Sequence, residues 1–145
     1  MQTFEFLFNP NSPDAVYDTF CFKPENKKEK RLGNLYIAGE IKNSLPQKRH
    51  FLSSLANIIK QEYYKDCNSS PEESFKKSLE KANEFLSSQI KNNEVDWLGN
   101  LNFVVLTINS SYSLNLTKVG NLRIFILKDS EILNIGQDTN LRQQA

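Results

Sequence analysis

The stretch that most constrains the fold is residues 70–91, SPEESFKKSLEKANEFLSSQIK. Ser70 offers a hydroxyl cap, Pro71 stands at the first helical position, and Glu73 follows three residues after the cap, a combination typical of a helix start. Apolar residues then recur at helical spacing, whereas the charged residues fall on the other faces: Phe75, Leu79, Ala82, Leu86 and Ile90 against Lys76, Lys77, Glu80, Lys81 and Glu84. The stretch therefore predicts one long amphipathic helix over residues 71–91.

A second helix is predicted just before it in the chain. Ser44 offers a hydroxyl, and Gln47 follows three residues later with a side-chain amide, so these two residues predict the helix start. The expected apolar face consists of Leu52, Leu55, Ile59 and Tyr63.

Strands are predicted on both sides of the helical pair. Before it, residues 3–8 alternate with a period of two, residues 16–22 are rich in aromatic and β-branched side chains, and residues 34–41 are almost continuously apolar. Residues 9–13 form a proline-containing turn cluster between the first two. After the helices, four short strands are expected at residues 102–108, 112–119, 122–127 and 131–135.

These elements predict an α+β fold with antiparallel sheets and two central helices. Residues 103–106 and 124–127 are apolar on both faces, which is typical of strands in a sheet that is covered on both sides. The two helices can cover one face, so we expect another layer on the opposite face.

Composition limits the classes of function. The chain has 145 residues, 39% of them hydrophobic, and its 18 Lys and Arg against 17 Asp and Glu leave a net charge of +1. This balance disfavours a nucleic-acid partner. Residues 97–117 are uncharged and long enough to cross a bilayer, but their many Asn and Ser residues favour two strands joined by a polar turn. We expect a single domain over residues 1–145, with no membrane partner in this chain.

The N-terminus lacks the features of a secretory signal, so we expect a cytoplasmic protein with reduced thiols. Cys21, Cys67 and His50 are too few for a closed zinc site, which needs about four ligands. A nucleophile pair between His50 and either cysteine is the alternative to ordinary structural roles. The excess of Lys over Arg and the many Asn residues are typical of a bacterial, AT-rich genome.

Residues 23–31, KPENKKEKR, carry five positive and two negative charges. A phosphate-binding patch is one interpretation. A solvated loop is the other, and it is favoured because Glu25 and Glu29 dilute the positive field and no aromatic residue is interleaved.

The order of elements and several short strings resemble the type 2C (PPM) metal-dependent protein phosphatases. Gly39 and Glu40 end a strand that resembles the family strand ending in Asp-Gly, where the Asp holds the metal pair. The other resembling strings are the Ala82-Asn83 pair, the segment that begins Gly99-Asn100, and Val119-Gly120-Asn121-Leu122-Arg123, which is similar to the family's Val-Gly-Asp-Ser-Arg. The resemblance implies part of an αββα sandwich.

This chain differs from the family at the positions that would bind the metal ions. Gly39 stands where the resemblance places a metal-binding Asp, and Asn121 replaces another. Glu40 should point to the opposite face of the strand unless a bulge rotates it. Glu25 and Glu29 lie near the place of an early acidic ligand without aligning to it. A two-metal site needs a clamp of carboxylates, which these residues do not supply.

We therefore expect a catalytically inactive, phosphatase-like binding or regulatory domain with no cofactor and an unknown protein partner. One alternative is an active Mn²⁺- or Mg²⁺-dependent serine/threonine phosphatase that uses Glu40, Glu29 and Asn121 around a bulge at Gly39. Another is an unrelated α+β interaction module, in which the loop at residues 23–31 or an exposed sheet face contacts the partner.

The length of the chain also bears on the choice between these functions. The resemblance implies a longer domain, so the chain would hold only its N-terminal part, and residues 136–145 look like an arbitrary ending. Such a fragment leaves sheet surface uncovered, and a second copy of the chain is one expected way to cover it.

Overall fold

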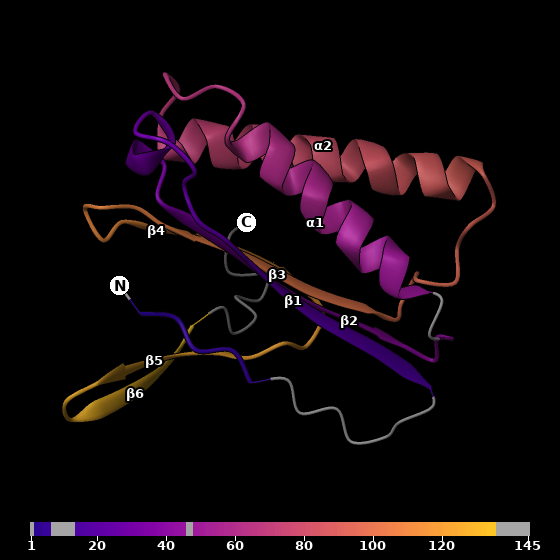
Figure 1. Cartoon of the computed structure of the whole chain (residues 1–145). Coiled ribbons are helices and arrows are strands. Elements are labelled where there is room, and N and C mark those ends of the chain that lie inside the picture. Colours follow the sequence, from indigo (N-terminus) through magenta and orange to yellow (C-terminus); the bar gives the residue numbers. More distant parts are fainter. Residues whose placement is uncertain (1, 7–13, 46–47, 136–145) are drawn as a thin grey trace, which may run out of the picture.

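The computed structural model describes residues 2–6, 14–45 and 48–135. Four strands form an antiparallel sheet in the order β1 (Ala15–Phe22), β2 (Asn34–Lys42), β3 (Leu101–Ile108) and β4 (Leu114–Val119). A 3-10 turn, η1 (Glu29–Arg31), lies between β1 and β2. Helices α1 (Arg49–Tyr63) and α2 (Pro71–Lys91) connect β2 to β3 and lie together on one face of the sheet (Figure 1). The predicted α+β class with antiparallel sheets is confirmed.

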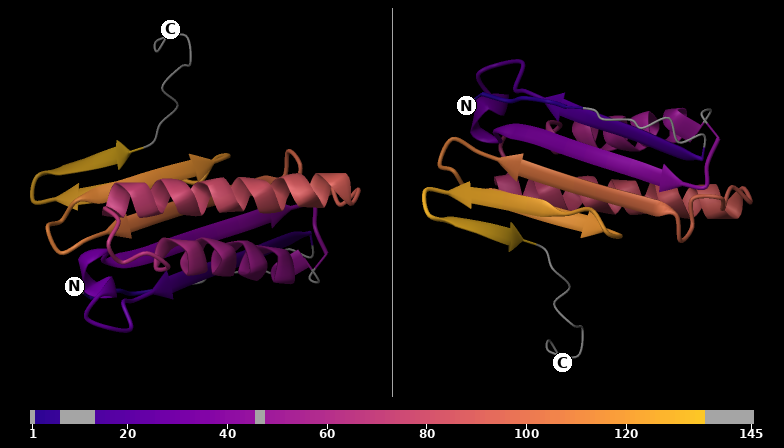
Figure 2. Two further views of the ribbon diagram at one scale, coloured as in Figure 1. Left: turned by 90° about the horizontal axis from the view of Figure 1, so that it is seen from above. Right: turned by 90° about the horizontal axis from the view of Figure 1, so that it is seen from below.

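A separate hairpin, β5 (Ile124–Lys128) and β6 (Glu131–Ile135), follows β4. It lies on the side of the sheet opposite the helices, below β4 in the view of Figure 1, and residues 2–6 run below the sheet as well (Figures 1 and 2). These two segments lie where another layer was expected, but residues 124–127 are not covered on both faces as predicted, because Phe125 is 51% and Leu127 is 74% exposed. That layer is incomplete, because Val104 and Leu106 on this face of β3 stay half-buried.

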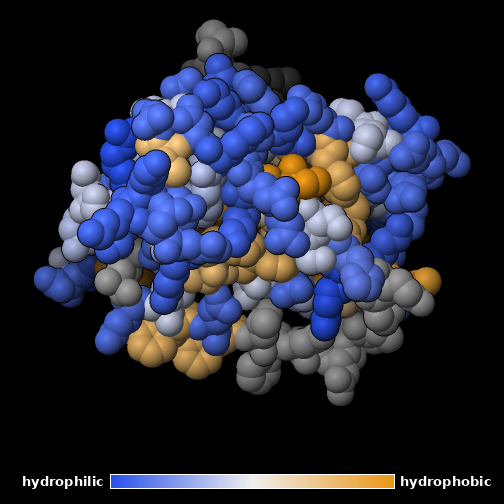
Figure 3. Space-filling model, turned by 45° about the horizontal axis from the view of Figure 1, so that its top comes forward, coloured by the Kyte–Doolittle hydropathy of each residue, from blue (hydrophilic) through white to orange (hydrophobic). Residues whose placement is uncertain are grey.

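The core lies between the helices and the sheet. Its central side chains come from one face of β2, one face of α1 and one face of β3: Leu35, Ile37, Ile41, Leu52, Leu55, Ile59, Tyr63, Phe103 and Val105. The apolar face predicted for α1 is thus buried throughout. The outer faces of the helices are largely hydrophilic, and apolar side chains gather beneath them (Figure 3). No helix in the described part of the chain is both long and apolar enough to cross a membrane.

The start of α2 is confirmed. Ser70 Oγ accepts a hydrogen bond from the backbone N–H of Glu73 at 3.1 Å, and Pro71 occupies the first turn, as the motif predicts. The apolar face of α2 ends earlier than predicted, because Ile90 near its C-terminus is 47% exposed. This end extends past the sheet beneath it, so its last apolar residue has little to pack against.

Two predictions about local structure are wrong. Residues 3–6 are not a strand: Phe4 and Phe6 are exposed, whereas the Thr3 hydroxyl lies 3.1 Å from the Tyr36 hydroxyl under the sheet. The rest of that predicted strand, like the turn cluster at residues 9–13, lies outside the described residues. Ser44 does not cap α1, because the helix begins at Arg49 after Lys48, which makes no side-chain cap. The Ser44 backbone N–H instead donates to the carbonyl of Asp14, which ties it to the sheet.

The predicted two-sided burial of residues 34–41 is also corrected. β2 alternates between buried and half-buried residues along its length, so only its helix-facing side is fully covered. The last four predicted strands are present, but β4 and β5 begin two residues later than expected, because the turns before them are longer.

Candidate functional site

Gly39 lies on the helix-facing side of β2, inside the core. A Cβ atom built on it would stand 2.8 Å from Leu52 Cδ2 and 2.9 Å from Phe103 Cδ2. Both neighbours are buried. The glycine therefore allows α1 and the Phe103 ring to approach the sheet backbone closely, and this position has no room for a metal-binding carboxylate.

Glu40 points to the opposite face, as the strand alternation predicts. β2 pairs without interruption with β1 and β3, where Gly39 stands opposite Asp18 and Phe103, and Glu40 stands opposite Tyr17 and Asn102. The bulge required for a rearranged metal site at Gly39 is therefore absent from this described ladder.

On the open face, Glu40 belongs to a hydrogen-bonded polar network. Its Oε2 accepts a hydrogen bond from Asn102 Nδ2 at 2.8 Å. On the other side, Tyr17 stands opposite Glu40 in the ladder, and the interaction of its hydroxyl with this carboxylate is the main reason why the pKa of Tyr17 is raised above its ordinary value. Burial and the negative charge of Glu40 act in the same direction.

Asn102 extends the network to the turn after β4. Its Oδ1 accepts a hydrogen bond from the backbone N–H of Asn121 at 2.8 Å. Gly120, at φ +78°, precedes this contact, and a Cβ there would collide with Asn102 Oδ1. The Gly120-Asn121 pair thus serves to bring the turn onto a buried amide, because only glycine tolerates both the backbone angle and the close approach.

The structure therefore brings three of the six candidate positions together, namely Glu40, Gly120 and Asn121. Gly39 is adjacent to Glu40 in sequence but faces the core. Gly99 has a φ of +75° with no atom within 4 Å of where a Cβ would stand, and Arg123 is exposed beyond the turn. Asn102, which links the three, was missed from sequence. The available signal was a single amide between Leu101 and Phe103 in an otherwise apolar strand start.

The other acidic candidates do not reach this network. Glu29 accepts hydrogen bonds from the Glu25 backbone N–H at 2.7 Å and from Asn26 Nδ2 at 2.8 Å, and Glu25 pairs with Lys60 at 3.0 Å. Both glutamates precede β2, whereas Glu40 lies six residues after its start, roughly 20 Å along a strand. Glu29 therefore does not come together with Glu40 and Asn121, as a rearranged metal site would require.

The candidates for a nucleophile pair, His50 and the two cysteines, also lie apart from one another. Cys21 and Cys67 are free, half-buried thiols. His50 stands at the N-terminal end of α1 and Cys67 follows its C-terminal end, so a helix of roughly 20 Å separates them. Cys21 lies opposite Tyr36 on the sheet face that points away from the helices. Among the described residues, no three His, Cys, Asp or Glu side chains gather as a metal-binding group.

Comparison with protein-family models found no match, and comparisons with curated proteins and with solved structures found none either.

Proposed function

We propose that this chain is a binding or regulatory domain without phosphatase activity, built on a framework that resembles the type 2C phosphatases. The observation that carries the proposal is the position of Gly39. The site that a metal-binding carboxylate would need is filled by Leu52 and Phe103, at 2.8 and 2.9 Å from where a Cβ would stand. The chain thus has a packed core where the resemblance implies a metal ligand.

The network around Glu40 supports the same proposal. A catalytic carboxylate needs lone pairs directed at a metal or a water molecule. Glu40 instead accepts a hydrogen bond from Asn102, and Asn102 uses its other end to hold the turn at Asn121. This arrangement stabilises the end of the sheet, and it leaves the half-covered face of β2 and β3 as the surface available to a protein partner.

The test is a phosphatase assay with p-nitrophenyl phosphate and Mn²⁺, run on the native chain and on Glu40→Ala. We expect both proteins to give the background rate. A Mn²⁺-dependent rate that the native chain shows and Glu40→Ala loses would overturn the proposal.

A calorimetric titration with Mn²⁺ separates metal binding from turnover. We expect no binding heat for the native chain or for Glu40→Ala. Saturable Mn²⁺ binding that requires Glu40 would favour the rearranged active phosphatase instead.

A further inference from the structure

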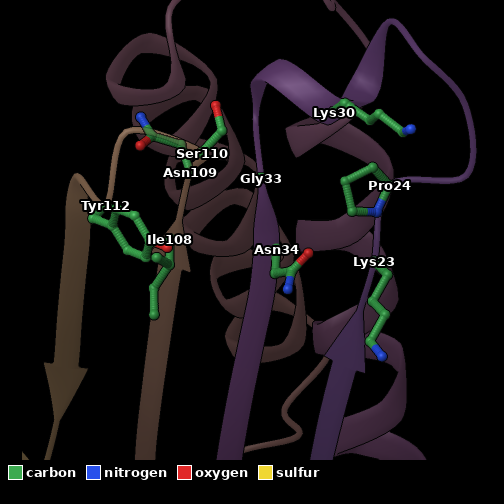
Figure 4. Close-up of a pocket in the computed structure, with 9 residues that line it drawn as sticks. All are labelled: Lys23, Pro24, Lys30, Gly33, Asn34, Ile108, Asn109, Ser110 and Tyr112. Atoms are coloured by element: carbon green, nitrogen blue, oxygen red, sulfur yellow. The ribbon is translucent and has the colours of Figure 1, made fainter. Parts of the chain in front are cut away.

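A surface hollow of about 550 Å³ lies at the end of the sheet far from Glu40. The start of β2 forms its middle, the segment after β1 forms one side, and the β3–β4 turn forms the other (Figure 4). The residues that matter here are Lys23, Lys30, Asn34, Asn109, Ser110 and Tyr112. Its volume is in the range of small-molecule sites.

The floor of the hollow is held rigidly. Gly33 has a φ of +78°, and a Cβ there would collide with the carbonyl of Ile108, so β2 and β3 approach closely at this point. The hydroxyl of Tyr64 donates to the Gly33 carbonyl at 2.7 Å, and that of Tyr63 donates to the Leu32 carbonyl at 2.6 Å. Two helix side chains therefore fix the backbone beneath the hollow.

The charge of the lining is positive. Among the described residues, Lys23 and Lys30 line the hollow and no carboxylate does. Glu25 and Glu29 are engaged elsewhere, Glu25 with Lys60 and Glu29 within its own loop. In the described structure neither lining lysine forms an ion pair. The carboxylates of Glu25 and Glu29 therefore stand outside the lining, where the two lysines carry the only charges among the described residues.

The opposite wall offers uncharged donors. Asn109 Oδ1 accepts hydrogen bonds from the backbone N–H groups of Ser111 and Ser113, both at 3.0 Å, so this side chain holds the turn in place. The Ser110 hydroxyl stands beside it in the lining. Ammonium, amide and hydroxyl donors without a carboxylate are a suitable lining for a phosphate group.

Tyr112 is the second, independent sign of a ligand. Its side chain is 85% exposed, and its backbone has a φ of +57°, a conformation that costs energy for an aromatic residue. The turn enforces this angle, because the Tyr112 N–H donates to the Asn109 carbonyl at 3.0 Å. Figure 4 shows the ring beside Ile108, across the hollow from the two lysines. A rigid turn thus holds an exposed ring on one wall and leaves the cations on the other.

We propose that this hollow binds a small phosphate monoester that carries a planar ring, with the ring against Tyr112 and the phosphate toward Lys23 and Lys30. Stacking on the tyrosine and charge-assisted hydrogen bonds to the phosphate would act together. The proposal is independent of the proposed function, because the hollow lies at the opposite end of the sheet from the Glu40 network.

The experiment is a titration of ¹⁵N-labelled protein with AMP or phenyl phosphate, followed by amide chemical shifts. We expect saturable shifts at Gly33, Asn34, Ser110 and Tyr112 with both probes. Adenosine and inorganic phosphate, which each carry half of the ligand, should bind at least about tenfold more weakly. Absence of saturable shifts with both monoesters, or equal binding of inorganic phosphate alone, would overturn the proposal.

Matched variants separate the hollow from general charge. Lys23→Gln/Lys30→Gln should weaken AMP binding about tenfold or more, whereas Lys27→Gln/Lys28→Gln removes the same charge from the same loop outside the hollow and should change binding less than twofold. Tyr112→Asn should also weaken binding, and it retains the fold because asparagine tolerates the backbone angle. Equal losses in the two lysine pairs, or unchanged binding in Tyr112→Asn, would refute the site.

Discussion

Replacing Gly39 by alanine tests the packing on which the proposed function depends. The added methyl group would stand 2.8 Å from Leu52 Cδ2 and 2.9 Å from Phe103 Cδ2. Ordinary van der Waals contact begins about half an ångström farther out. Leu52 is fully buried and Phe103 is 6% exposed, so neither side chain can move into solvent.

The magnitude follows from two opposing effects. Overpacking of a closed core costs about 1–3 kcal/mol. Alanine also restricts the unfolded chain, which stabilises the protein by about 0.4–1 kcal/mol. We therefore expect Gly39→Ala to lower the free energy of unfolding by roughly 0.5–2 kcal/mol.

Urea unfolding is the assay, followed by the fluorescence of the single tryptophan. Trp97 is buried and stacks on Phe51 with a centroid distance of 5.8 Å, so its emission reports on the same core. Gly99→Ala is the contrasting control, because Gly99 has no atoms within 4 Å of its hypothetical Cβ, so any cost there comes from its left-handed backbone angle of +75° and not from packing.

The decisive measurement repeats Gly39→Ala in a Leu52→Val background, which removes the contacting Cδ2 atom. There the alanine should cost about half as much as in the native chain, because the contact with Leu52 is gone and the contact with Phe103 remains, whereas the cost of Gly99→Ala should be the same in both. A neutral Gly39→Ala, or an equal cost in the two backgrounds, would refute the packing argument.

Three further outcomes are expected from the same unfolding assay. Asn102→Ala leaves the Glu40 carboxylate and the Asn121 N–H without their shared partner, so it should lower the free energy of unfolding by about 1–3 kcal/mol. An unchanged free energy of unfolding would mean that water replaces both hydrogen bonds. Ser70→Ala removes the cap of α2 and should cost about 1 kcal/mol, and Ser70→Asp should restore it. Burial raises the pKa of Tyr63 from 10.0 to about 12, so Tyr63 stays protonated to higher pH in the folded state than in the unfolded state. The free energy of unfolding should therefore fall by about 2 kcal/mol between pH 10 and 12. The pKa of Tyr64 is also raised by burial, so Tyr63→Phe should reduce the total fall by about that amount without abolishing it, and an unchanged slope would contradict the assignment.

The sequence predicted the elements whose signals are local. Ser70 and Pro71 defined the start of α2, and the spacing of Leu52 to Tyr63 defined the buried face of α1. The start of α1 was missed because Ser44 has a competing partner, the carbonyl of Asp14, which is distant in sequence. The N-terminal alternation was misleading because the pattern shows a period but does not show which strand, if any, supplies a partner.

The candidate site was predictable only in part, for a related reason. Alternation along β2 correctly separated Gly39 from Glu40. Asn102 could not be assigned, because its role depends on the pairing of β3 with both β2 and β4, which places one amide between a carboxylate and a turn. The hollow was missed because the charge of residues 23–31 was counted as a sum, whereas the pairing of Glu25 with Lys60 separates the two signs in space.

The opposed directions of Gly39 and Glu40 also limit how this chain could gain a metal site. A carboxylate at position 39 would enter the core against Leu52, where an unpaired charge is strongly destabilising. Turning that position to the open face requires β2 to slip by one residue, which would move Leu35, Ile37 and Ile41 out of the core together. No single substitution at Gly39 therefore restores the implied ligand. The glycine and the network of Glu40 are two consequences of one strand register, and the proposed binding on the open face is compatible with that register.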